Sequence, residues 1–172
     1  MKKLYILFLA TCLFVLSACS DTTNNTTIEP ILNVEQFSLV SQTSIKENLG
    51  EPKSYEEINF QTPSTGANNL LTYLYYDWEG YYSEFVFDDK DRLIQINIYP
   101  NDNKESKFVK TSFEDLLKQL SITPGKRMKK AADTGYAWRY QSVSDKVDEV
   151  WSMGDEKGFD TIKISFDVRP FL

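Results

Sequence analysis

Strand-like segments joined by short acidic turns constrain the fold of this chain more than any other feature. Residues 84–87 lead through Asp88–Asp91 into Leu93–Tyr99, where apolar and polar side chains alternate. A similar arrangement recurs between residues 149 and 166. Because successive side chains of a strand point to opposite faces of a sheet, this pattern predicts two antiparallel hairpins, each with a covered face and a polar face.

The alternation also predicts which side chains share a face of the sheet. It places Ile94, Ile96 and Ile98 on the covered side. The opposite, polar side is predicted to carry Gln95, Asn97, Tyr99, Lys163, Ser165 and Asp167. Trp151 joins that polar side if the adjacent Val150 is buried in the core.

Two segments carry the signals of a helix start, and they align with each other at residues 43–50 and 111–118. Each contains the hydroxyl and carboxylate of a capping box, Ser44-x-x-Glu47 and Thr111-x-x-Glu114. Gly50, with a proline two residues later, is expected to end the first helix.

Helices and hairpins together predict an α+β fold made of two helix-plus-antiparallel-sheet repeats. The repeats are expected at residues 34–102 and 103–172. Neither repeat is long enough to bury a large core by itself, so we expect one compact unit. In this unit the two repeats share a curved sheet with the helices on one face.

The N-terminus has the layout of an export signal, with two lysines before an apolar run, Leu4–Leu16, that is too short to cross a bilayer. The run ends in Leu16-Ser17-Ala18-Cys19, which resembles the lipobox of bacterial lipoproteins. The resemblance implies a signal peptide at residues 1–18 and a diacylglycerol anchor on the Cys19 sulfur. We therefore expect a protein anchored at the extracytoplasmic face of the cell membrane, with residues 19–33 as a flexible tether.

A capped helix, an aromatic strand and a hairpin follow one another at Ser44–Pro52, Leu71–Tyr76, Glu84–Asp88 and Leu93–Tyr99. A divergent second copy lies at Thr111–Gly125 and Tyr136–Phe166. This order resembles the tandem repeat of the beta-lactamase inhibitory protein superfamily and the small lipoproteins of the outer-membrane assembly machinery. The resemblance implies a curved sheet whose concave, aromatic-lined face binds another protein.

Charge and composition exclude several classes of function. The net charge of −6 argues against nucleic-acid binding. The absence of histidine excludes Ser-His-Asp and Cys-His catalysis and imidazole zinc sites. No phosphate-binding loop or dinucleotide motif occurs. We therefore expect no enzyme, no cofactor and no metal site.

The remaining prediction is a non-catalytic module that binds a protein or another component of the cell envelope. Tyrosine and tryptophan are enriched at the energetic centres of interfaces, because they bury a large area with little loss of entropy. The candidate partner-binding residues are Tyr75, Trp78, Tyr99, Trp138 and Trp151.

Two alternatives remain open. The carboxylates of Asp77, Glu79 and Glu84 flank an aromatic segment, as in a cell-envelope hydrolase that uses a carboxylate pair. The oxygen-rich segments Asp88–Asp91 and Asn101–Asn103 suggest a small-ligand or Ca²⁺-binding lipoprotein, although both lack the glycine and the final glutamate of an EF-hand loop.

Overall fold

The structure is a computed structural model that describes residues 28–100, 108, 112–155 and 158–172. The predicted signal peptide, Cys19 and most of the predicted tether lie outside the described residues. A search of the described part finds no helix that is long and apolar enough to cross a membrane.

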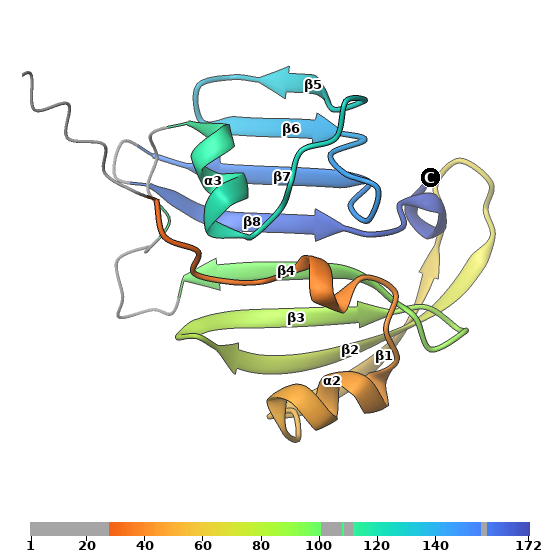
Figure 1. The fold of residues 1–172 in the computed structure, drawn as a ribbon. Helices are drawn as coiled ribbons and strands as arrows, with labels where there is room; N and C mark the ends of the chain where they lie inside the picture. The colour runs from red at the N-terminus through yellow and green to blue at the C-terminus, as the bar shows by residue number, and fades with distance from the viewer. Residues whose placement is uncertain (1–27, 101–107, 109–111, 156–157) are drawn as a thin grey trace, which may run out of the picture.

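Eight antiparallel strands of the described residues form one sheet in the order β1-β2-β3-β4-β8-β7-β6-β5 (Figure 1). The edges of the sheet are therefore β1 and β5, and its centre is the pairing of β4 with β8, from Gln95–Ser165 to Ile98–Ile162. The strands are β1 (Ser54–Gln61), β2 (Asn68–Trp78), β3 (Tyr81–Phe87), β4 (Leu93–Pro100), β5 (Lys129–Asp133), β6 (Ala137–Gln141), β7 (Glu149–Gly154) and β8 (Phe159–Ser165).

This architecture shows that the predicted α+β fold of two helix-plus-sheet repeats is wrong. Strands make up 43% of the described residues, and helices make up only 16%. The α-helices in the described part are α2 (Gln42–Leu49) and α3 (Phe113–Gln119), which are eight and seven residues long. The fold is a single antiparallel sheet with two short helices, closer to an all-β protein.

Both helices begin at a serine cap, but not at the predicted residue. The Ser41 hydroxyl accepts a hydrogen bond from the Ser44 N–H at 3.2 Å, so α2 begins one turn before the predicted cap. The Ser112 hydroxyl accepts from the Asp115 N–H at 3.1 Å at the start of α3. The first helix ends as predicted at Gly50, whose φ of 83° suits glycine.

The helices and the N-terminal segment lie on one face of the sheet, which we call the covered face (Figure 1). Ile45 of α2 and Leu116 of α3 are fully buried there. They belong to a hydrophobic core that extends along the chain from Leu32 to Phe166. Because this core includes residues of both halves of the sheet, it joins the halves into one unit.

The folded part begins before the predicted end of the tether at residue 33. The N–H groups of Ile31 and Leu32 donate to the Gln119 carbonyl at 2.8 and 2.9 Å. This carbonyl lies in the last turn of α3, where helix carbonyls lack partners within the helix. Leu32 is also buried in the core.

A β-bulge between β3 and β4 corrects one predicted side-chain orientation. The register shifts after Val86, which makes Ile94 the extra residue of β4. A bulge breaks the strict alternation of side chains along a strand. Ile96 and Ile98 belong to the covered-face core as predicted, whereas Ile94 packs with Leu71 and Val86 in a separate cluster.

The C-terminal turn η2 (Arg169–Phe171) covers this separate cluster at one end of the opposite face. Phe171 packs against the cluster, and its ring makes an edge contact with Phe60 at 5.6 Å between centroids. In the described part of the chain, no α-helix lies over the rest of this face (Figure 1). We call it the uncovered face.

Candidate functional site

A row of side chains on the uncovered face crosses six neighbouring strands. The row follows the cross-strand register, from β2 to β6, through Tyr75, Glu84, Asn97, Lys163, Trp151 and Arg139. Tyr99 lies on the same face, two residues after Asn97 on β4. Three of the predicted partner-binding residues, Tyr75, Tyr99 and Trp151, therefore lie on one surface.

Four tyrosines of β2, β3 and β4 stand side by side on the described part of this face. The ring planes of Tyr73 and Tyr75 meet at 22°, and their centroids are 6.3 Å apart. The corresponding values are 15° and 6.0 Å for Tyr75 and Tyr82. For Tyr82 and Tyr99 they are 38° and 5.9 Å. We call this set the tyrosine ladder; the ring planes of neighbouring members lie within 38° of parallel.

Two glutamates accept hydrogen bonds from the tyrosine ladder. The Tyr75 hydroxyl donates to Glu56 Oε2 at 3.0 Å, and the Tyr99 hydroxyl donates to Glu84 Oε2 at 3.4 Å. Glu84 Oε2 also accepts from Asn97 Nδ2 at 2.8 Å. Among the described residues, neither glutamate forms an ion pair with a lysine or arginine.

Gln95 extends this network inward. Its Nε2 donates to Asn97 Oδ1 at 2.8 Å, while its Oε1 is buried without a hydrogen-bond partner in the described structure. A buried acceptor without a donor costs about 1–3 kcal/mol. Gln95 Oε1 is thus a buried acceptor of this part of the face that no donor of the described residues satisfies.

Burial and the two carboxylates raise the pKa values of the ladder tyrosines. Burial, followed by the charge of Glu84 and its hydrogen bond, raises the pKa of Tyr99 to about 12. Burial and then the hydrogen bond to Glu56 raise the pKa of Tyr75. Burial, assisted by the charge of Glu84, raises the pKa of Tyr73 and Tyr82. All four hydroxyl groups are thus protonated at neutral pH.

Basic and aromatic side chains occupy the other part of the uncovered face, over β6, β7 and β8. Arg139 Nη2 lies 2.7 Å from Glu149 Oε2. Lys163 pairs in register with Trp151, and its Nζ is 5.3 Å from the centroid of the Phe171 ring. Burial lowers the pKa of Lys163. The face is therefore acidic and tyrosine-rich on one side and basic on the other.

The other two predicted binding residues lie on the covered face, so their predicted placement on an open surface is wrong. Trp78 is 8% exposed, and its ring centroid lies 5.5 Å from that of Phe37 and 5.6 Å from that of Phe85. Trp138 packs against the same core and makes an edge contact with Phe159 at 5.3 Å. Both tryptophans stabilise the fold from inside.

The carboxylates of the hydrolase alternative have different surroundings. Glu84 belongs to the hydrogen-bond network of the ladder. Asp77 pairs in register with Tyr82 on the same face and forms an ion pair with Lys53. Glu79 is exposed in the turn between β2 and β3, with a φ of 51°. Asp77 and Glu84 thus lie on the same face in neighbouring strands, whereas Glu79 lies in the turn.

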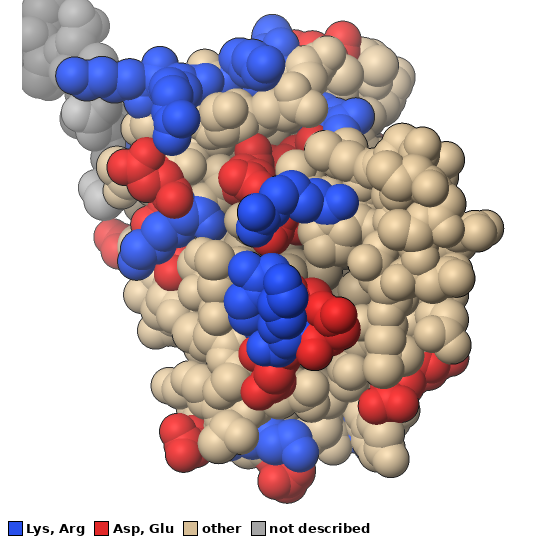
Figure 2. Space-filling view, turned by 90° about the vertical axis from the view of Figure 1, so that its right-hand side faces the viewer, with Lys and Arg blue, Asp and Glu red and all other residues tan. Residues whose placement is uncertain are grey.

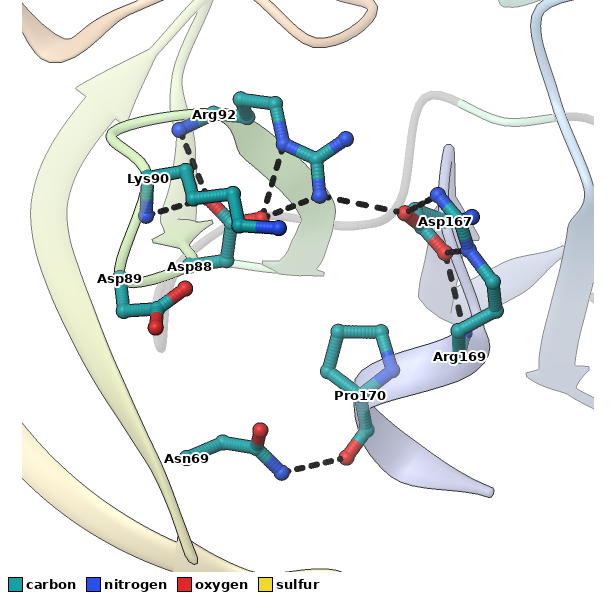
Figure 3. Close-up of a pocket in the computed structure, with 8 residues that line it drawn as sticks. All are labelled: Asn69, Asp88, Asp89, Lys90, Arg92, Asp167, Arg169 and Pro170. Carbon is teal, nitrogen blue, oxygen red and sulfur yellow. Dashed lines mark hydrogen bonds and ion pairs between the residues drawn. The ribbon is translucent and has the colours of Figure 1, made fainter.

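The acidic turn after β3 contributes to a polar pocket of about 440 Å³ (Figure 3). Asp88 Oδ1 accepts from the N–H groups of Lys90 and Arg92 at 3.1 and 2.9 Å. Arg92 Nη2 lies 2.5 Å from Asp88 Oδ2 and 3.5 Å from Asp167 Oδ2, and Arg169 also pairs with Asp167.

Figure 2 shows lysine and arginine side chains close to acidic ones at the end of the molecule that carries the C-terminus. Within the described ranges, no group of three or more aspartate, glutamate, histidine or cysteine side chains is arranged to hold a metal ion. The second oxygen-rich segment, Asn101–Asn103, lies outside the described residues.

Three residues of the candidate site were missed from the sequence. Tyr73 lies two residues before Tyr75, and Tyr82 lies two residues before Glu84, so alternation alone predicts that each pair shares a face. Glu56 was missed because the sequence signal of its edge strand β1 is weak.

No family model, curated protein or solved structure matches the chain. The resemblance to the beta-lactamase inhibitory protein superfamily therefore stays a prediction, and the function is argued from the geometry of the uncovered face.

Proposed function

We propose that the chain is a lipoprotein, anchored at the extracytoplasmic face of the membrane through Cys19, that binds a partner protein without catalysing a reaction. The partner would bind to the uncovered face of the sheet. The observation that carries this proposal is the tyrosine ladder, with its four half-buried rings on a face that no α-helix of the described residues covers. Tyrosine suits such a surface because it combines a large apolar ring with a polar tip.

The ladder is also ordered before any partner binds. Each ring contacts a neighbouring ring, and hydrogen bonds to Glu56 and Glu84 fix two of the hydroxyl groups. Side chains that are already held in place lose little conformational entropy on association. This supports an interface function for the face.

The ring orientation favours a protein over a polysaccharide as the partner. Sugars stack on exposed ring faces, but Tyr75 has a neighbouring tyrosine ring on each side, Tyr73 and Tyr82. Ring edges and hydroxyl groups suit contacts with peptide groups and side chains of a protein.

Site-specific crosslinking in native membranes tests the binding face. We expect a photoreactive phenylalanine analogue at Tyr82 to capture a discrete protein, detected by mass spectrometry. The matched control is Tyr55, which is 71% exposed and pairs in register with the core residue Leu74 on the helix side of the sheet. Capture of the same proteins from both positions, or from Tyr55 alone, would contradict the proposal.

The anchor is tested separately with Cys19→Ser in the full chain. Because serine lacks the sulfur that accepts the diacylglycerol, we expect the variant to stay unprocessed or to appear in the medium. Cell fractionation and immunoblotting with the wild-type chain as reference measure this. A normally cleaved variant that stays on the membrane would show that Cys19 is not the anchor.

A further inference from the structure

The acidic part of the uncovered face holds carboxylates without cations of their own. Glu56 and Glu84 form no ion pair among the described residues. The other carboxylates of the same face do have such partners, since Asp77 pairs with Lys53 and Glu149 pairs with Arg139. The unpaired charge is therefore concentrated at the tyrosine ladder.

Hydrogen bonding adds to the excess of acceptors at the ladder. The hydroxyl groups of Tyr75 and Tyr99 donate their hydrogens to the two glutamates, so each offers only lone pairs to a partner. Both hydrogen bonds to Glu84 are accepted by Oε2, and none in the described structure reaches Oε1. Gln95 Oε1 also lacks a donor, but it is buried and is not offered to a partner.

The acceptors lie in neighbouring rows of the sheet. The register places Glu56, Tyr73, Val86 and Gln95 in one row. The next row holds Tyr75, Glu84 and Asn97. A ligand that lies across β1 to β4 would thus contact one glutamate in each row, with tyrosine rings beside both glutamates.

We infer that the partner presents lysine or arginine side chains to the tyrosine ladder, where they pair with Glu56 and Glu84. The inference rests on the proposed function, because it names the chemistry of the partner bound at the same face. Cations would pair with two carboxylates that have no cation of their own among the described residues, and charge-assisted hydrogen bonds to carboxylates are stronger than neutral ones. Complementary charge also raises the rate of association and selects against acidic partners.

Fluorescence anisotropy with model ligands tests this inference on the full chain in detergent micelles. The probes are a labelled peptide of alternating arginine and serine, an equally long peptide of alternating glutamate and serine, and labelled chitohexaose. We expect only the arginine peptide to bind. Glu84→Gln and Glu56→Gln are each expected to weaken that binding by about tenfold, because each removes one charge partner.

Glu57→Gln is the matched control. Glu57 is the next residue on β1, so its side chain points to the opposite face, and its substitution changes the net charge by the same amount. We expect it to change the affinity by less than about twofold. In Glu84→Gln, the glutamine side chain keeps an oxygen acceptor for Asn97 Nδ2. A thermal melt of each variant checks that the fold is intact.

Three outcomes would overturn the inference: no binding of the arginine peptide, equal loss in all three glutamine variants, or binding of chitohexaose at the ladder. Crosslinking then separates the two proposals. If the analogue at Tyr82 still captures its protein from both the wild type and Glu84→Gln, the face binds a partner through other chemistry. If Tyr82 captures nothing specific, the proposed function itself fails.

Discussion

The indole of Trp78 fills the space on the covered face between η1 (Glu35–Phe37) and β3, where it contacts Phe37 and Phe85. Removal of a buried aromatic ring leaves a cavity and typically costs about 3–5 kcal/mol. We expect Trp78→Ala to lower the free energy of unfolding by about this amount. Urea denaturation followed by circular dichroism measures the change.

Tyr99→Ala is the comparison for Trp78→Ala, because Tyr99 is a half-buried ring on the uncovered face. Its loss is expected to cost about 1 kcal/mol, as for an average substitution. A loss as large as that of Trp78→Ala would mean that the ladder serves the stability of the fold and not binding.

Alternation predicts single side chains well where both faces of a strand differ in polarity. It placed Tyr99 and Trp151 on the polar side. Tyr75 and Trp78 are three positions apart, and an odd spacing on a strand puts two side chains on opposite faces, so they could not share a surface. Trp138 was harder to place, because every residue of β6 is partly buried and its sequence does not alternate.

At the scale of elements, the chain of ion pairs from Asp88 through Arg92 to Asp167 joins η2 to the turn between β3 and β4 (Figure 3). The hydrogen bond from Arg169 lowers the pKa of Asp167. A lowered pKa in the folded state adds stability above the ordinary value of about 3.9, and this stability is lost as the pH falls through the lowered value.

We therefore expect Asp167→Asn to reduce the free energy of unfolding by about 2 kcal/mol at pH 7. The difference from the wild type should shrink below about pH 4, as the wild-type carboxyl becomes protonated. Chemical denaturation across this pH range measures both effects. Asp145→Asn is the control, because the Asp145 side chain is 96% exposed in its pair with Arg127 and should contribute less than about 0.5 kcal/mol. A constant difference at all pH values would contradict the role of the charge.

The central strands were predictable as elements, and the edge strands were not. Leu93–Tyr99 matches β4 within one residue, because its alternation reflects one buried and one polar face. Every residue of β5 is exposed, so no apolar pattern marks it in the sequence, and in β1 the apolar alternation is confined to Ile58 and Phe60. The bulge at Ile94 leaves no sequence signal either, because a separate apolar cluster with Leu71 and Val86 buries this isoleucine on the opposite face.

At the scale of the whole molecule, the error in fold class has the same cause: the edge strands leave a weaker signal in the sequence than the other elements do. Helix caps are local signals that a few residues reveal, whereas edge strands form through pairing with neighbours that are distant in the sequence. The prediction therefore gave two short helices too much weight and missed two of the strands. The side of the sheet on which a helix packs depends only on the position of its apolar residues. In the structure, Ile45 and Leu116 pack on the same face.

Because the N-terminal segment attaches to α3 at Ile31 and Leu32, the folded part begins close to Cys19 in the sequence, which limits its distance from the proposed lipid anchor. Ile28 is 28 − 19 = 9 residues after Cys19, and an extended chain spans at most about 3.6 Å per residue. With the lipid at Cys19, as proposed, these nine residues hold Ile28 within about 32 Å of the anchored sulfur. The N-terminal segment joins the fold on the covered face, through Ile31 and Leu32. The uncovered face is therefore on the opposite side of the sheet from this attachment point.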